Sequence, residues 1–174
     1  MSMKSHILAA MNEALTRWEE LLAGLDEEQI TAPLPPGSWS VKDDIVHLWA
    51  WQQRSKARFE AALLDREPVF PRWDDGLDPE DETTTEQINA WIFDTYRGKP
   101  WSRVYQDWKE GFQRLLELAE QVPERDLLDP SRYPWLEGHP LAFVLVASYD
   151  HHQEHYEKLQ ARLQELRDYG DGHQ

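Results

Sequence analysis

The segment PLAFVLVASYDHHQEHYEKLQARLQELR, residues 140–167, indicates the fold most directly. It predicts an α-helix that starts near Pro140 and runs to about Arg167, which at 1.5 Å per residue is roughly 40 Å long. At about 100° per residue, one stripe of this helix is mostly apolar and is expected to face a core. The stripe consists of Val144, Ser148, His155, Leu159 and Leu166. The segment therefore predicts a long helix with one core-facing side.

Further helices are predicted upstream of this segment, separated by proline-rich stretches that end helices. Their ranges are 4–25, 41–64, 101–121 and a shorter one at 85–97. Ser40 has the character of an N-cap, with Asp43 three residues on as a weak capping-box partner. No alternating strand pattern of useful length occurs. The predicted fold is all-α, a four-helix bundle with an extra short helix and long crossover loops at 65–83 and 122–139.

Composition excludes several classes of protein. The chain has 174 residues and a net charge of −15, which argues against nucleic-acid and anionic-membrane partners because phosphates need Lys or Arg for neutralisation. Hydrophobic residues make up 40% and aromatic residues 11%, which is too much for a disordered acidic chain. The absence of cysteine excludes disulfides, thiolate metal sites and cysteine nucleophiles.

The length suits one domain, which we expect to cover residues 1–168, followed by a flexible polar tail at 169–174. The first eight residues lack the pattern of a signal peptide. No apolar stretch approaches the roughly 18 residues needed to span a bilayer. We therefore expect a soluble cytoplasmic protein with no membrane partner.

Four of the seven histidines lie beyond the first turn of a main predicted helix, His47 in the second and His151, His152 and His155 in the last. Residues four apart share a helix face, so two imidazoles at that spacing can point at one ion. Zn, Ni and Fe accept neutral imidazole nitrogen. A third ligand must then come from another helix. His47, in the second predicted helix, is the candidate for this ligand. The alternative is a polar patch on a solvated helix face.

Position around the helices leaves two choices open. His151 lies about 40° to one side of His155 and His152 about 60° to the other, so periodicity cannot choose between them. His47 lies on a mostly polar stripe about 120° from the centre of its helix's apolar face. Such a stripe suits either a helix bordering a cleft or plain solvent exposure. The remaining three histidines are interpreted as exposed or capping: His6, His139 and His173.

Two segments resemble motifs of the DinB-like superfamily. WSVKDDIVHL, residues 39–48, is similar to its helix-two signature, and SYDHHQEH, residues 148–155, is similar to its last-helix motif. The Trp-Ile-Phe stretch at 91–93 resembles the ClbS/DfsB subgroup. The resemblance implies an up-down-down-up four-helix bundle with a three-histidine metal site. The positions that match the family's ligands are His47, His151 and His155, whereas His152 does not match.

The resemblance also implies a range of activities. Family members include metal-dependent hydrolases and thiol S-transferases that act on small electrophiles, and many members have no known activity. We therefore expect a metal-dependent enzyme for detoxification or self-protection, with one divalent ion (Zn, Ni or Fe) per chain and no catalytic residue assigned. The alternative is a non-catalytic protein of the ClbS/DfsB type that binds or sequesters a small molecule. A homodimer is a further expectation.

Other side chains are candidates for the surroundings of the site. Asp43 precedes His47 by one turn and could accept its second N–H, although a first-turn acid is equally suited to the helix dipole. Trp51 and Tyr149 could wall an apolar pocket, or they could simply be core residues. His152 is expected beside the ligands.

Two arginines and two loops complete the candidates. Arg54 and Arg58 could receive an anionic substrate, or they could pair with nearby acids. The loops at 65–83 and 122–139 could cover the site as a lid, or they could cover bundle edges or form a dimer contact. Their aromatic residues are Phe70, Trp73, Tyr133 and Trp135.

Overall fold

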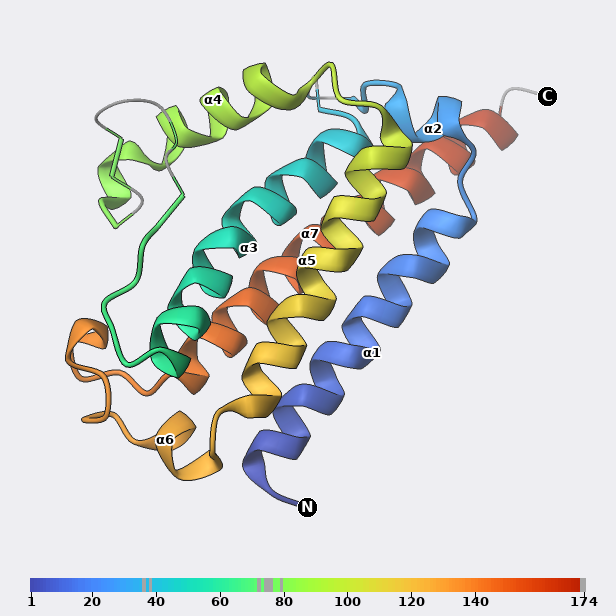
Figure 1. The fold of residues 1–174 in the computed structure, drawn as a ribbon. Helices are drawn as coiled ribbons and strands as arrows, with labels where there is room; N and C mark the ends of the chain where they lie inside the picture. The colour runs from blue at the N-terminus through green and yellow to red at the C-terminus, as the bar shows by residue number, and fades with distance from the viewer. Residues whose placement is uncertain (36, 38, 72, 74–76, 79, 173–174) are drawn as a thin grey trace.

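Four long helices form the bundle in the computed structural model (Figure 1). They are α1 (Met3–Ala23), α3 (Val41–Leu63), α5 (Trp101–Gln121) and α7 (Ala142–Asp171). Helix α1 runs in one direction, α3 and α5 run in the opposite direction, and α7 returns parallel to α1. The predicted all-α bundle with up-down-down-up order is therefore confirmed.

Short elements connect the long helices. The structure describes residues 1–35, 37, 39–71, 73, 77–78 and 80–172. Within these ranges the connecting elements are α2 (Glu27–Thr31), the 3₁₀ turn η1 (Glu82–Thr84), α4 (Thr85–Tyr96), α6 (Glu124–Leu128) and the 3₁₀ turn η2 (Pro134–Leu136). The described residues contain no strand. Helix α4 is the predicted short helix, whereas α2 and α6 were not predicted.

The start of α3 follows from its capping residues. The Ser40 side chain accepts a hydrogen bond from the backbone N–H of Asp43 at 3.2 Å. In return, Asp43 Oδ2 accepts from the Ser40 N–H at 2.8 Å. This capping box satisfies two backbone donors that a helix start leaves open. It fixes the residue at which α3 begins, and this helix carries part of the candidate site.

The core lies between the four long helices. Helix α3 contacts α5 and α7, and α1 contacts the same two helices, so the four close into a ring. Trp18 and Trp108 are fully buried and meet edge to face, with ring centroids 6.2 Å apart. The polar site residues described below lie at the edge of this apolar ring.

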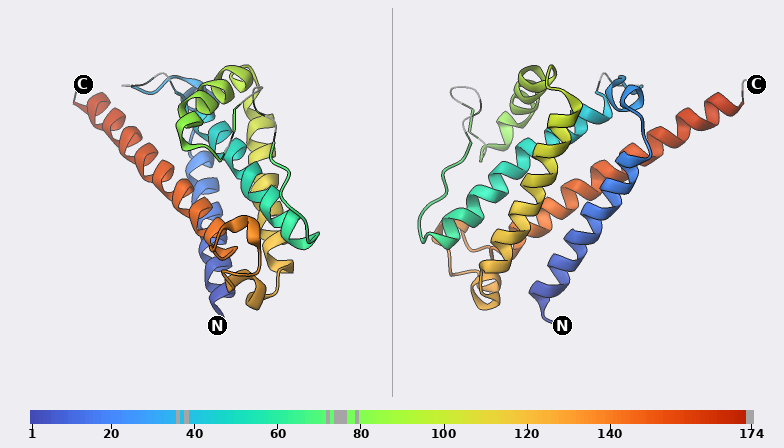
Figure 2. Two further views of the ribbon diagram at one scale, coloured as in Figure 1. Left: turned by 90° about the vertical axis from the view of Figure 1, so that its left-hand side faces the viewer. Right: turned by 45° about the vertical axis from the view of Figure 1, so that its right-hand side comes forward.

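The far end of α7 differs from the expected tail. The helix continues to Asp171, so residues 169–171 are helical in the structure. Its last turns project beyond the other long helices (Figure 2). His173 lies outside the described residues. Among the helices that the structure describes, none is long and apolar enough to span a bilayer.

Both crossover loops pack onto the bundle. Trp73, from the loop between α3 and η1, is buried and meets Trp51 edge to face at 4.9 Å between ring centroids. Tyr133 and Leu136, which precede α7, belong to the main hydrophobic core. Trp73 and Tyr133 therefore cover bundle edges, and Trp73 does so beside the candidate site.

Candidate metal centre

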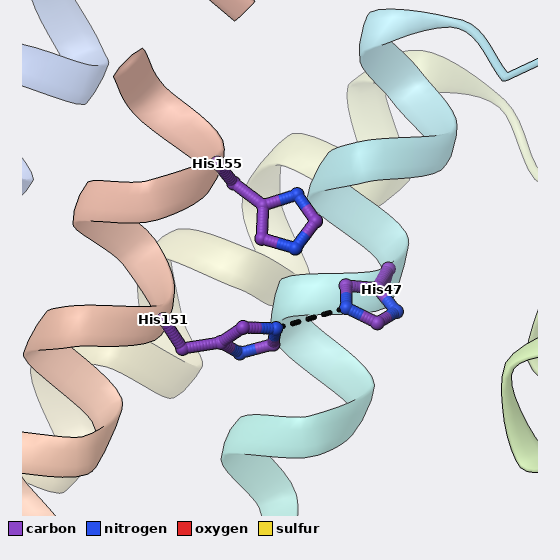
Figure 3. A group of neighbouring side chains, drawn as sticks. All are labelled: His47, His151 and His155. Carbon is purple, nitrogen blue, oxygen red and sulfur yellow. Dashed lines mark hydrogen bonds between the residues drawn. The ribbon is translucent and has the colours of Figure 1, made fainter. Parts of the chain in front are cut away.

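Helices α3 and α7 bring three histidines together. His47 projects from α3 toward His151 and His155 on α7 (Figure 3). The Nε2 atoms of His47 and His151 are 2.9 Å apart, and one ring nitrogen from each of the three residues lies within 4.8 Å of the others. Segments about a hundred residues apart in sequence thus share one cluster.

The cluster has the composition of a site for a transition metal. Nitrogens bound at about 2.1 Å to one ion lie roughly 3.0–3.4 Å apart for octahedral to tetrahedral angles. The separation between His47 and His151 is close to this value, while the 4.8 Å spread of the whole set is wider. Three neutral imidazoles are a donor set that Zn, Ni and Fe accept.

Burial keeps the His47 and His151 imidazoles neutral. Desolvation lowers the pKa of His47 to about 2, with the neighbouring histidines as a smaller cause. Desolvation also lowers the pKa of His151 to about 4, assisted by His155. At neutral pH both rings therefore carry no charge, and their lone pairs are free of competition from protons.

The His47 ring has an unsatisfied polar atom. Its Nδ1 is buried and has no hydrogen-bond partner, which is uncommon for a polar atom in a protein interior. The Asn89 side chain, on α4, is close enough to raise the pKa of His47 slightly, although it forms no hydrogen bond of ordinary geometry with that nitrogen. The Trp39 and Trp51 rings flank the imidazole at 5.3 and 6.4 Å between centroids. These aromatic contacts restrict the orientation of His47.

A buried carboxylate orients His155. Asp44, which is 6% exposed, places Oδ1 3.2 Å from Nδ1 of His155. This contact favours the tautomer that donates from Nδ1 and leaves the Nε2 lone pair free. Carboxylates commonly hold metal-binding histidines in this way. Sequence reasoning missed Asp44, and the only available signal was its position one turn before His47.

Asp43 was expected in this supporting role, and the structure places it elsewhere. Its Oδ2 accepts hydrogen bonds from the backbone N–H and the hydroxyl of Ser40, at 2.8 and 2.9 Å. The expected contact to His47 is not formed, because Nδ1 of that ring has no partner. The reason is position, since the third residue of a helix serves the cap of that helix.

His152 lines the cavity beside the cluster, as expected of a neighbouring residue, but its ring nitrogens do not face the cluster. Its Nδ1 lies 2.9 Å from the carbonyl oxygen of Ser148, and Nε2 accepts from the Trp108 indole at 3.3 Å. Burial lowers its pKa to about 3. Both ring nitrogens are thus engaged, and the Phe112 ring packs edge to face against the imidazole. Helical periodicity left open whether His151 or His152 joins the cluster. The packing of the helices places His151 there.

A cavity of about 460 Å³ adjoins the cluster. Trp51 lines it and donates from Nε1 to Asn89 Oδ1 at 2.7 Å. Arg54 and Arg58 also line it. Tyr149, expected in a pocket wall, instead packs against the hydrophobic core and is not among the described residues that line this cavity. The polar stripe of α3 therefore borders a hollow beside the histidines.

Comparison with known proteins adds a family and three similar folds. A model of the DinB superfamily matches residues 10–159. The structure named Sibling Lethal Factor Precursor, DfsB, is 11% identical with a TM-score of 0.77 and 98% coverage of both chains. A Streptococcus pneumoniae protein is also 11% identical, with a TM-score of 0.70 and coverage of 93% of this chain and 92% of its own.

The third fold is the colibactin self-resistance protein ClbS, whose crystal structure is a complex with double-stranded DNA. It is 16% identical with a TM-score of 0.67, over 91% of this chain and 95% of its own. No curated protein is significantly similar in sequence. At these identities the three structures establish a shared fold.

Proposed function

Because this chain belongs to the DinB superfamily, we propose that it is a metal-dependent enzyme acting on a small electrophilic compound, by hydrolysis or by thiol transfer. The resemblance that the sequence showed to DinB-like proteins is confirmed, and DfsB and ClbS are among the proteins that share its fold. The proposed role is detoxification or self-protection. Under this proposal His47, His151 and His155 hold one divalent ion, Zn, Ni or Fe, per chain.

One observation carries the proposal. Three imidazole nitrogens from two helices converge within 4.8 Å at the wall of a 460 Å³ cavity. When bound, such an ion supplies Lewis acidity, which polarises an electrophile and acidifies a water or thiol that it coordinates. No other described residues form a comparable group of His, Cys, Asp or Glu.

The chain's own residues prepare the site for that chemistry. Burial keeps His47 and His151 neutral, so they are ready to bind at physiological pH. Asp44 holds the ring of His155 and thereby reduces the reorganisation that binding costs. Trp51 and Phe143 supply apolar wall beside the cluster, which suits the carbon skeleton of a small electrophile.

The metal content of protein purified without a histidine tag tests the proposal. We expect one ion per chain in the wild-type protein and loss of that ion in His47→Ala and in His155→Ala. His6→Ala is the matched control, because His6 is exposed and lies in α1, away from the cluster. The control should keep a full complement of metal. Wild-type protein that stays metal-free in excess Zn and Ni would overturn the proposal.

Binding or sequestration without catalysis is the second candidate. The cavity beside the cluster favours it, because a hollow of about 460 Å³ with aromatic walls can hold a small apolar molecule without any metal. The neighbour ClbS is named a self-resistance protein. Ligand kinetics distinguish the two candidates. A sequestering protein is saturated at one ligand per chain, whereas an enzyme continues to consume the electrophile beyond that ratio.

The remaining partners are proposals as well. ClbS was crystallised with double-stranded DNA, but the net charge of −15 on this chain opposes contact with phosphates. We therefore propose that nucleic acid is not a partner, and fluorescence anisotropy with a labelled duplex at low salt would detect it if it were. A homodimer and a cytoplasmic location also remain predictions.

A further inference from the structure

The cavity beside the histidines also contains a pair of charged side chains. Arg54 and Arg58 lie on α3 after Trp51, and both line the same 460 Å³ hollow as the histidines. Seven residues separate His47 from Arg54, which corresponds to about 10 Å along an α-helix. One small molecule could therefore reach both the histidine cluster and the arginines.

Both guanidinium groups converge on one carboxylate. Arg54 Nε and Nη2 each lie 2.8 Å from Oε1 of Glu80. Arg58 Nη2 contacts Oε1 at 2.8 Å and Oε2 at 2.9 Å. Two positive charges thus face one negative charge. Burial, and secondly the charge of Arg54, lower the pKa of the Arg58 guanidinium.

Aromatic rings position the arginines independently of Glu80. The Arg54 guanidinium carbon lies 5.9 Å from the Trp51 ring centroid, and that of Arg58 lies 5.5 Å from the Phe70 centroid. Such cation–π contacts restrain a guanidinium without neutralising its charge. Two arginines held in place by rings therefore remain ready to bind an anion.

Glu80 is the exposed partner of this group. Its side chain is 42% exposed, compared with 24% for Arg54 and 19% for Arg58. It belongs to the segment between α3 and α4, so it approaches the arginines from outside the bundle. A solvent-exposed carboxylate regains hydration when it leaves, so its departure costs little.

We propose that Arg54 and Arg58 form a subsite for the carboxylate of a small acidic substrate, and that Glu80 occupies this subsite until the substrate displaces it. Arginine binds carboxylates through charge-assisted hydrogen bonds, and a carboxylate is the group that contacts both guanidinium groups now. This inference rests on the proposed function for the statement that the substrate reacts beside the histidines. The expected substrate is an electrophile whose carboxylate lies on the order of 10 Å from its reacting carbon.

Benzoate and its neutral analogue benzamide are suitable probes, titrated calorimetrically into metal-free protein. We expect benzoate to bind about tenfold more tightly than benzamide, because only benzoate forms charge-assisted hydrogen bonds with the arginines. Arg58→Gln should weaken benzoate about tenfold for the same reason. Glu80→Gln should tighten benzoate severalfold, because it removes the competing carboxylate. Arg114→Gln, on the exposed face of α5, is the matched control and should leave both affinities unchanged.

The Glu80→Gln variant keeps the test falsifiable, because a misfolded protein cannot show a gain in affinity. Equal affinities for benzoate and benzamide would overturn the subsite. A Glu80→Gln variant with wild-type benzoate affinity would overturn the role of Glu80 as occupant. The use of metal-free protein separates this inference from the proposed function. Protein that discriminates benzoate but never binds metal would disprove only the metal centre, and the reverse result would disprove only the subsite.

Discussion

Two faces of α7 carry histidines in opposite circumstances. His151 and His155 face α3, where ring nitrogens crowd together beside a cavity. His152 is the immediate neighbour of His151, yet it points into the core toward Trp108 of α5. A difference of one residue, about 100° around the helix, separates a candidate ligand from a structural side chain.

Hydrogen-bond satisfaction is what distinguishes the two faces. On the core face both ring nitrogens of His152 have hydrogen-bond partners, so neither nitrogen is available to a ligand. Opposite the other face, on α3, the Nδ1 atom of His47 has no partner, and its Nε2 meets only the Nε2 of His151. A buried histidine whose ring nitrogens lack a hydrogen-bond donor or acceptor in the protein is suited to bind a ligand. A buried histidine whose ring nitrogens are both hydrogen-bonded stabilises the fold.

Acidification should have the largest effect on the free energy of unfolding, because it acts on the histidines of the cluster and on His152 in the core. Burial lowers the folded-state pKa of His47, His151 and His152 to about 2, 4 and 3, against 6.5 when unfolded. Below pH 6.5 these histidines therefore bind protons in the unfolded chain but remain neutral in the folded chain. The free energy of unfolding consequently falls as the pH falls. We expect a loss of roughly 2 kcal/mol per histidine between pH 6.5 and 5.

Urea unfolding of metal-free protein at a series of pH values, followed by circular dichroism, measures this loss. The variant His152→Phe should show a shallower dependence, since it removes the contribution of the core face alone. A free energy of unfolding that stays flat from pH 7 to 5 would contradict the neutrality of all three rings.

Removal of Trp108 isolates the core face. Trp108→Ala empties the space beside Trp18 and leaves Nε2 of His152 without its donor. We expect a loss of about 3–5 kcal/mol in the free energy of unfolding. The metal affinity of the molecules that remain folded should equal that of the wild type. A parallel loss of metal affinity at a temperature where the variant is folded would show that the two faces are coupled.

Removal of the Asp44 charge isolates the cluster face. Asp44→Asn keeps the shape of the side chain but weakens its hold on Nδ1 of His155. We expect metal affinity to fall about 10–100-fold, the usual effect of losing such a partner. Competition against a chromophoric chelator would measure the change. Unchanged affinity would mean that His155 does not depend on Asp44.

The adjacent acid should have the smallest effect. Asp43→Ala removes the reciprocal half of the capping box at Ser40 and should cost about 1 kcal/mol of stability. Metal affinity should not change, because Asp43 does not contact the cluster. If this variant lost metal affinity as strongly as Asp44→Asn, the assignment of the two acids to different roles would be wrong.

Much of the fold was predictable because it is local. The ranges expected for the long helices differ from the observed ones by no more than four residues at either end. Ser40 was recognised as a cap because its partner lies only three residues away. The short helices α2 and α6 were missed, since five residues are too few to show a periodic pattern.

The amino-acid sequence was enough to predict the class of fold, and it carries the resemblance that singled out His47, His151 and His155. The packing of the helices was needed to show that Asp44 rather than Asp43 contacts the cluster, and that the ring nitrogens of His152 are engaged in the core. Helical periodicity sets the angle between neighbouring side chains but not the rotation of one helix against another. That rotation is set by the packing of α7 between α1 and α3, which joins segments about a hundred residues apart.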